Sequence, residues 1–333
     1  MLKMSGVLIN NWKKIFYVSL ATAIVLTGIL MVISGCKKAA EKTYTVGIVN
    51  PNLGDKLITE GFLEGMKKHG YLEGKNITYI VSQKTDTMDA DIISMMARNV
   101  DLIFTVTTPA TRAAQKVGEG TKIPIVFVMY DPVESGVVKS LREHGNTITG
   151  IKIRGSTPKA IEWLLKIDPN IKQIYIPVAF DTKAAEQSIK DVKDFVSGKD
   201  IKLIISEVNT AEELKASLSS IPREVDAIFI PHSIIVLSNL KTLMDSAIKL
   251  KLPVVSSGHA EFKEGVVVSY GQDQLRTGSQ ASRLADSILK GTPPSGLPVE
   301  TADFFLGINV KSAQAMGLTI PNDILQQADH IVR

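Results

Sequence analysis

The stretch "DLIFTVTTPATRAAQKV", residues 101–117, decides the fold class. Its first six residues, "DLIFTV", are mostly apolar and include Ile, Phe and Val, which is typical of a buried strand. In "TTPAT" (107–111), a proline after threonine marks the first turn of a helix, which we expect to run from Pro109 to Val117. A short buried strand that leads directly into a helix is half of a βαβ unit.

The same alternation continues on both sides of this stretch. It indicates a parallel sheet with helices packed on its faces. The expected strands of this first set are 44–50, 76–83, 101–106 and 123–128, and the other expected helices are 55–69 and 90–99.

A second set follows, with its second and third strands 24 residues apart, as in the first set (77 to 101 and 202 to 226). The chain therefore predicts an α/β protein made of two Rossmann-like lobes with parallel sheets. Ligands bind beyond the carboxyl ends of such strands, so facing lobes form a ligand cleft. The expected strands are 172–178, 201–208, 226–231 and 252–257, and the helices are 182–197, 211–218 and 235–251.

Composition and motifs exclude several function classes. The first strand is followed by "VNPNLGD" (49–55) without GxGxxG, and GxxxxGK[ST] is absent, so no nucleotide cradle is expected. The net charge of +4 includes three lysines of the N-terminal segment 1–14. The sequence has no basic stripe with interleaved aromatics, so we expect no nucleic acid as a partner. GxSxG is missing, and "HAE" (259–261) lacks the PCxxC of a zinc deaminase. We expect no enzyme, no cofactor and no metal site.

The N-terminal segment has the layout of an export signal. Residues 1–14 carry three lysines and residues 15–35 carry no charge. An uncleaved transmembrane helix is the alternative, but "ISGC" (33–36) resembles the lipobox of bacterial lipoproteins. We therefore expect a signal peptide over 1–35, a lipid such as palmitate on Cys36 and a tether over 36–43. Cys36 is the only cysteine, so no disulfide is expected.

Three further stretches carry a family resemblance: "YDPVESGVVKSL" (130–141), "GNTITGI" (145–151) and the tail from 306 to 332. They resemble the substrate-binding lipoproteins of bacterial ABC importers of the tryptophan/tyrosine type. The resemblance implies a type I periplasmic binding protein fold that clamps a small solute, an amino acid or a related carboxylate. It also implies an exported, monomeric chain that serves a permease and an ATPase. We expect it at the outer face of the plasma membrane or, in a Gram-negative cell, in the periplasm or at the outer membrane. The alternative is a lipid-anchored ligand sensor that docks on a membrane receptor.

That fold crosses between its lobes three times. We expect the crossings near Arg154 to Thr157, near Tyr270 to Asp273 and near Pro298 to Thr301. Lobe 1 is then 44–154 plus 273–297, and lobe 2 is 155–272 plus 298–333.

Ligand contacts are expected where strands end. In lobe 1, the free amides and dipole of the helix start favour an anion, although Thr108 could simply cap the helix. Tyr130 offers a stacking face, and Asp131 could contact the ligand or cap the turn at Pro132. Asn52 is expected at the cleft, and the alternative is that it caps the next helix. The candidates in lobe 1 are Asn52, Thr107, Thr108, Ala110, Thr111, Tyr130 and Asp131.

Lobe 2 departs from the family at two strand ends. Many relatives have Thr-Asp-Asn in place of His232-Ser233-Ile234 and Asp-Glu in place of Gly258-His259. The exchange removes negative charge and adds imidazoles, which casts doubt on an α-ammonium ligand and favours an anionic or neutral one. If both histidines contact an anion, affinity should rise as pH falls from about 8 to about 6. The candidates here are Phe180, Asp181, His232, Ser233, Gly258 and His259, with Tyr270 and Asp273 at the second crossing.

Overall fold

The computed structural model describes residues 42–51, 55–258 and 261–333. Residues 44–333 form one compact unit. The export signal, Cys36, Asn52 and His259 lie outside the described residues. Within the described ranges, every helix is too short or too polar to cross a bilayer.

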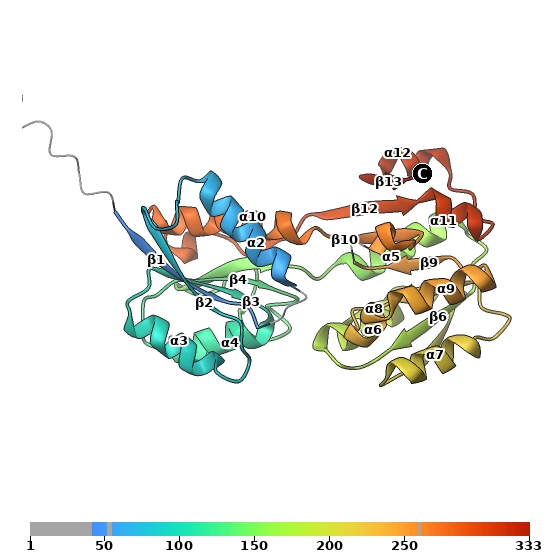
Figure 1. Ribbon diagram of the computed structural model, residues 1–333, viewed down its shortest axis with the longest axis horizontal. Coiled ribbons are helices and arrows are strands. Elements are labelled where there is room, and N and C mark those ends of the chain that lie inside the picture. Colours follow the sequence, from blue (N-terminus) through green and yellow to red (C-terminus); the bar gives the residue numbers. More distant parts are fainter. Residues whose placement is uncertain (1–41, 52–54, 259–260) are drawn as a thin grey trace, which may run out of the picture. The chain divides into compact units, whose positions relative to one another are not determined.

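The first sheet has six parallel strands in the order β11-β5-β4-β3-β1-β2 (Figure 1). Its central strands β3 and β4 are buried along their whole length, as expected of strands covered on both faces. We call this sheet and its helices lobe 1. The strands are β1 (Tyr44–Val49), β2 (Ile77–Ser82), β3 (Leu102–Val106), β4 (Ile125–Met129), β5 (Ile148–Lys152) and β11 (Glu300–Thr301), and the helices are α2 (Lys56–Lys68), α3 (Met88–Ala97), α4 (Thr108–Val117) and α10 (Gln274–Leu289).

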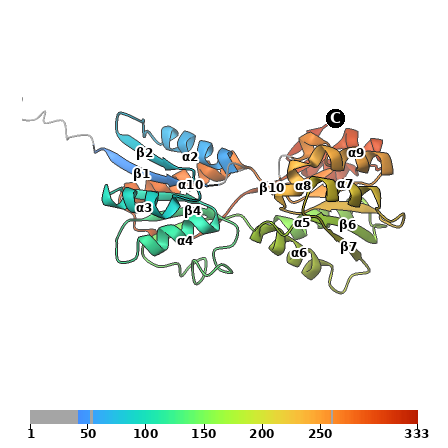
Figure 2. The ribbon, with the colours of Figure 1, turned by 60° about the horizontal axis from the view of Figure 1, so that its bottom comes forward.

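The second sheet has seven strands in the order β13-β12-β10-β9-β8-β6-β7 and, with its helices, forms lobe 2 (Figure 2). Its helices cover a continuous apolar core that includes Trp163 and Phe229. The strands are β6 (Gln173–Val178), β7 (Lys202–Glu207), β8 (Ala227–Ile230), β9 (Val254–Ser256), β10 (Val268–Gln272), β12 (Phe304–Asn309) and β13 (His330–Val332). The helices are α5 (Ser156–Ile167), α6 (Lys183–Val196), α7 (Ala211–Ser219), α8 (Ile234–Ser238), α9 (Leu240–Leu250), α11 (Val310–Ala315) and α12 (Asn322–Gln327).

The structure differs from the expected pattern in three places. β12 runs antiparallel to β10, so the second sheet is only mostly parallel. The helix expected over 235–251 is broken at Asn239 into α8 and α9. Glu300 and Thr301 pair with β5, so the segment 298–301 belongs to the first sheet and the third crossing follows at residues 302–303.

Helices α2 and α10 pack together through glycines. A Cβ atom on Gly61 would overlap the carbonyl oxygen of Leu275, and one on Gly278 would overlap that of Ile58. Below this contact, Phe62 stacks on Phe104 of β3 with ring centroids 4.0 Å apart. The two backbones approach closely only because no side chain separates them. This contact seats α10, the first helix after the second crossing, on lobe 1.

The three crossings contact one another. Gly155, in the first crossing, has a φ of +142°, a conformation that favours glycine. The ring of Phe304, which begins β12, lies close to Gly155 and stacks on Tyr270 of β10 with centroids 5.8 Å apart. Arg276 of α10 lies 4.6 Å from the ring centroid of Phe305. Segments far apart in sequence are therefore held together where the chain passes between the sheets.

Candidate functional site

The start of α4 is strained. Thr107 has φ +86° and ψ 155°, a backbone region occupied almost only by glycine. Its amide donates to the carbonyl of Val128 at 2.9 Å, and its carbonyl accepts from the amide of Thr111 at 3.2 Å and from the Thr111 hydroxyl at 2.8 Å. The neighbouring strand and the first helical turn thus hold Thr107 in this conformation, and such strain is concentrated at ligand sites.

This turn leaves hydrogen-bonding capacity unused. The Oγ1 atom of Thr107 is buried and has no hydrogen-bond partner among the described residues. Thr108 and Ala110 carry the first amides of the helix, which have no acceptor one turn earlier, and Pro109 carries no N–H at all. A buried orphan hydroxyl beside free helix amides is the arrangement that accepts an anion or a polar oxygen.

Thr111 does not contribute to this capacity. It is fully buried, and its hydroxyl lies between the Thr107 carbonyl and the Thr105 hydroxyl, which is 2.9 Å away. Thr111 therefore supports the turn from beneath, whereas Thr108 is partly exposed at its start.

Asp131, directly after β4, has the structural role that was the alternative to ligand contact. Its Oδ1 atom accepts from the amides of Val133 at 3.0 Å and Glu134 at 3.1 Å, which caps the turn that follows. Its Oδ2 atom lies 2.8 Å from Arg154 and 3.8 Å from Lys152. Burial raises the pKa of Asp131, but the Glu134 amide and Arg154 outweigh that effect, so the pKa lies below its ordinary value.

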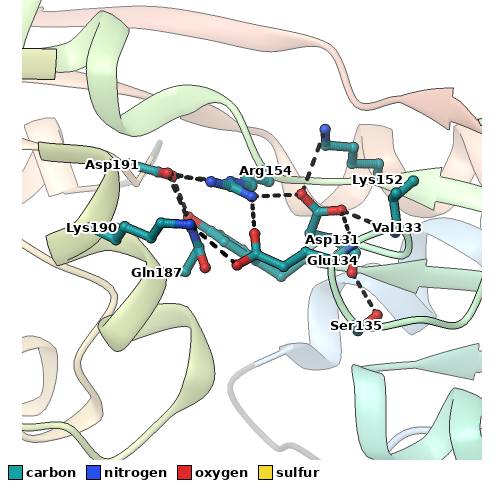
Figure 3. Close-up of polar contacts among 10 residues, drawn as sticks. Asp131, Val133, Glu134, Ser135, Lys152, Arg154, Gln187, Lys190 and Asp191 are labelled. Carbon is teal, nitrogen blue, oxygen red and sulfur yellow. Dashed lines mark hydrogen bonds and ion pairs between the residues drawn. The ribbon is translucent and has the colours of Figure 1, made fainter. Parts of the chain in front are cut away.

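Arg154 links the two lobes (Figure 3). Its guanidinium pairs with Asp131 and Glu134 of lobe 1 and with both carboxylate oxygens of Asp191 on α6. Burial lowers the pKa of Arg154, but the hydrogen bonds to Asp191 and Asp131 raise it by a larger amount, so the net shift is upward. The sequence predicted only that Arg154 stands at a crossing and did not predict this ionic role. An arginine one residue before the crossing glycine was the available signal, but its partner on α6 is 37 residues away.

Tyr130 and His232 come from different lobes and contact each other. Their ring centroids lie 5.7 Å apart with the planes at 75°, an edge-to-face arrangement. The Tyr130 hydroxyl lies 3.5 Å from Asp191. Burial, followed by the charge of Asp191, raises the pKa of the Tyr130 phenol, so it stays protonated. The structure thus brings together two predicted site residues that are about a hundred positions apart.

His232 is a neutral imidazole at physiological pH. Its Nε2 atom lies 3.1 Å from the hydroxyl of Ser257, just after β9. Burial lowers its pKa to about 4, although Asp191 acts in the opposite direction. Without a ligand, the charge of His232 therefore does not change between pH 8 and pH 6, and the expected rise in affinity would require that a bound anion raise its pKa.

The other polar candidates of lobe 2 bond within the lobe. Asp181 accepts from the amide of Ile235 at 3.0 Å, at the start of α8, and lies 3.4 Å from the hydroxyl of Ser233. Ser233 is fully buried and accepts from the amide of Ala179 at 3.2 Å. Phe180 is different, because 43% of it is exposed.

Three more candidates lie near the end of β9 and at the second crossing. The amide of Gly258 donates to Ser256 at 3.0 Å, and the Glu261 carboxylate lies so close that any side chain at this position would overlap it. Tyr270 stacks on Phe304. Asp273 accepts from the amide of Arg276 at 3.0 Å and caps α10. In the described ranges, no three His, Cys, Asp or Glu side chains come together to hold a metal ion.

Two mostly parallel sheets flanked by helices, joined by crossings, define the type I periplasmic binding protein fold. The chain belongs to the family of ABC transporter substrate binding proteins, which matches it over residues 45–332. Members of this family bind solutes outside the cytoplasm and are not enzymes. The fold and family implied by the sequence motifs are thereby confirmed.

Individual relatives agree with this assignment. The chain is 26% identical to the tyrosine-binding protein of Clostridioides difficile over 250 residues, which are 73% of this chain and 71% of that one. A conserved domain protein from Vibrio cholerae has a TM-score of 0.72 and 26% identity, covering 88% of this chain and 100% of its own. An ABC domain in complex with L-Trp from Streptococcus pneumonia has a TM-score of 0.73 and 23% identity, covering 87% of this chain and 100% of its own.

Proposed function

We propose that this protein is a lipid-anchored receptor for an aromatic amino acid or a related small carboxylate, which it delivers to an ABC importer. The observation that carries the proposal is the start of α4, where a strained Thr107 leaves a buried hydroxyl free beside the first helix amides. The relative that binds tyrosine and the structure that contains L-Trp support an aromatic amino acid as the ligand class.

The ligand carboxylate would lie on the amides of Thr108 and Ala110, with Thr107 Oγ1 as a further hydrogen-bond donor. Tyr130 and His232 would offer ring faces to an aromatic side chain, and Phe180, which is exposed, adds apolar surface. Asp131, Asp181 and Ser233 would act indirectly, by fixing the turns at the strand ends. Asn52, Gly258, His259, Tyr270 and Asp273 remain proposed contacts.

Calorimetric titration tests this arrangement with a matched series of compounds: tyrosine, tryptophan, tyramine and 4-hydroxyphenylpropionate. Tyramine lacks the carboxylate and 4-hydroxyphenylpropionate lacks the ammonium group. If the carboxylate is the anchor, tyramine should bind at least about a hundredfold more weakly than tyrosine, because the α4 donors lose their partner. Loss of binding by 4-hydroxyphenylpropionate alone would instead show that the ammonium group dominates.

The anchor is a separate part of the proposal. "ISGC" at 33–36 and the lack of any other cysteine support lipidation of Cys36. Mass spectrometry of the membrane fraction should find a diacylglyceryl group on an N-terminal Cys36. A mature chain that still begins at Met1 would contradict it.

Sensing is the second candidate function, because a lipid-anchored solute receptor could dock on a membrane receptor instead of a permease. Uptake of radiolabelled ligand separates the two. Deletion of this protein should abolish high-affinity uptake if it serves an importer, and should leave uptake unchanged if it serves a sensor.

A further inference from the structure

We propose that Arg154 is an orientational latch between the lobes: its guanidinium, fixed to lobe 1, holds α6 of lobe 2 in one orientation through Asp191. This inference goes beyond solute binding, because it concerns the contact between the two lobes and not the contact with the ligand. It rests on the Arg154 ion cluster, which comprises Asp131, Glu134, Lys152, Arg154, Lys190 and Asp191 (Figure 3).

The backbone of Arg154 belongs to lobe 1. Its amide donates to the carbonyl of Tyr130 at 2.9 Å, and the amide of Ile153 donates to that of Met129 at 3.0 Å, so the pairing of β4 and β5 continues past the end of both strands. The next residue, Gly155, has the positive φ at which the chain leaves lobe 1. The side chain of Arg154 is thus mounted on the last fixed residue before the crossing.

The side chain reaches into lobe 2 as a fork. Nε lies 3.2 Å from one oxygen of Asp191, and Nη2 pairs with the other oxygen. A bidentate pair of this kind fixes the relative orientation of two groups as well as their distance, because both hydrogen bonds weaken when either plane turns. Rotation of α6 against β5 therefore breaks this contact.

The latch is sheltered and saturated. Arg154 is 21% exposed, Asp131 10% and Asp191 8%, so water screens the central pairs less than an ordinary surface pair. The Arg154 ion cluster holds three basic and three acidic side chains and is neutral overall. The Arg154 ion cluster therefore offers no unpaired charge that would attract a charged ligand.

Spectroscopic distance measurement tests the latch without any ligand, so its outcome is independent of the proposed function. The substitution Cys36→Ser removes the only thiol from the full chain. The substitutions K116C on α4 and K215C on α7 then place one spin label on each lobe. We expect a single narrow distance distribution. Arg154→Gln and Asp191→Asn should each broaden or shift it, and the double variant should go no further than either single variant.

Three additional variants make the test specific. Arg154→Lys keeps the charge but loses the fork, so it should resemble Arg154→Gln. Lys190→Gln removes an exposed pair with Glu134 at 3.7 Å and should leave the distribution unchanged. Arg154→Ala should broaden the distribution, and millimolar methylguanidinium should narrow it again by refilling the space beside Asp191.

Three results would contradict the latch. Unchanged distances in Asp191→Asn, which keeps the side-chain volume, would show that the contact does not hold the lobes. Additive shifts in the double variant would show that Arg154 and Asp191 act separately. A wild-type distribution in Arg154→Lys would show that charge suffices and that orientation is not held by the fork. If Arg154→Ala does not fold, as judged by circular dichroism, Asp191→Asn, Arg154→Gln and Arg154→Lys carry the test.

Discussion

The strand ends of the two lobes are built from the same strand–helix units, but they differ in whether the threonine at the helix start is hydrogen-bonded within the protein. At the start of α4 in lobe 1, Thr107 is strained and its buried hydroxyl has no partner. At the start of α6 in lobe 2, Thr182 is relaxed: its hydroxyl accepts from the amide of Ala185 at 2.9 Å and donates to the carbonyl of His232 at 3.0 Å. Lobe 1 thus retains capacity for a ligand, and lobe 2 uses its own polar groups for stability.

This difference requires that lobe 1 be rigid elsewhere, since backbone strain persists only where the surroundings enforce it. The glycine contact between α2 and α10 is the strongest candidate for that support. Gly278→Ala should therefore destabilise the protein by about 3 kcal/mol, because a backbone carbonyl cannot move aside as a side chain can. Urea unfolding should show the loss by far-UV circular dichroism.

Trp163 makes this prediction lobe-specific, since it is the only tryptophan in the described residues and lies in the core of lobe 2. Its fluorescence should respond less to Gly278→Ala than the circular dichroism does. Gly296→Ala is the matched control, because a Cβ there meets only side-chain atoms at 3.7 Å and beyond. If Gly278→Ala and Gly296→Ala lose the same free energy of unfolding, the glycine contact is not the source of rigidity in lobe 1.

The same substitution at the two helix starts should have opposite effects on stability. Thr107→Gly relieves the strain and should stabilise the protein by about 1 kcal/mol. Thr182→Gly removes two hydrogen bonds and should destabilise it by about 1 kcal/mol. Calorimetric titration should show about tenfold weaker ligand binding for Thr107→Gly, corresponding to one lost hydrogen bond. Destabilisation by both variants would mean that Thr107 is not strained.

The last predicted effect concerns His232 and pH, and it appears only when the pH is lowered. Its folded pKa of about 4 lies below the ordinary value of 6.5, so the unfolded chain binds the proton first as pH falls. The contribution to stability is complete above pH 6.5 and is lost towards pH 4. Between pH 7 and pH 5.5 this loss should be about 1 kcal/mol.

His232→Gln should remove that part of the pH dependence of stability. Unfolding curves of the variant and the parent at pH 7 and pH 5.5 measure the difference. An unaltered pH dependence would show that His232 titrates at its ordinary value. His232 would then gain charge towards pH 6 even without a ligand, which favours the predicted rise in affinity for an anion.

The sequence predicted the strands well because their apolar runs are local. β1 (44–49 against an expected 44–50) and β6 (173–178 against 172–178) are within a residue of expectation. β5 was not assigned, since "ITGIK" is short and interrupted by Gly150. The antiparallel direction of β12 has no local signal, because an apolar strand looks the same in either direction.

The candidate site was predicted only where chemistry follows from a local motif. "TTPAT" marked the helix start, but its positive φ at Thr107 could not be predicted, because a β-branched residue rarely adopts it. The motif at Asp131 left two roles open, and only the geometry of the turn shows that it caps. Arg154 was missed as an ionic centre because its partners come from β4 and α6, far apart in the chain.

The return of the chain to lobe 2 after visiting lobe 1 sets an order for folding during synthesis and export. β10 needs β12 on one side, and β12 begins at Phe304, after the chain has passed through α10 and β11 of lobe 1. Until β12 emerges, β10 has an open edge of hydrogen-bonding groups, and such edges recruit other strands. A nascent chain that stalls before Phe304 exposes this edge and is therefore expected to be prone to aggregation.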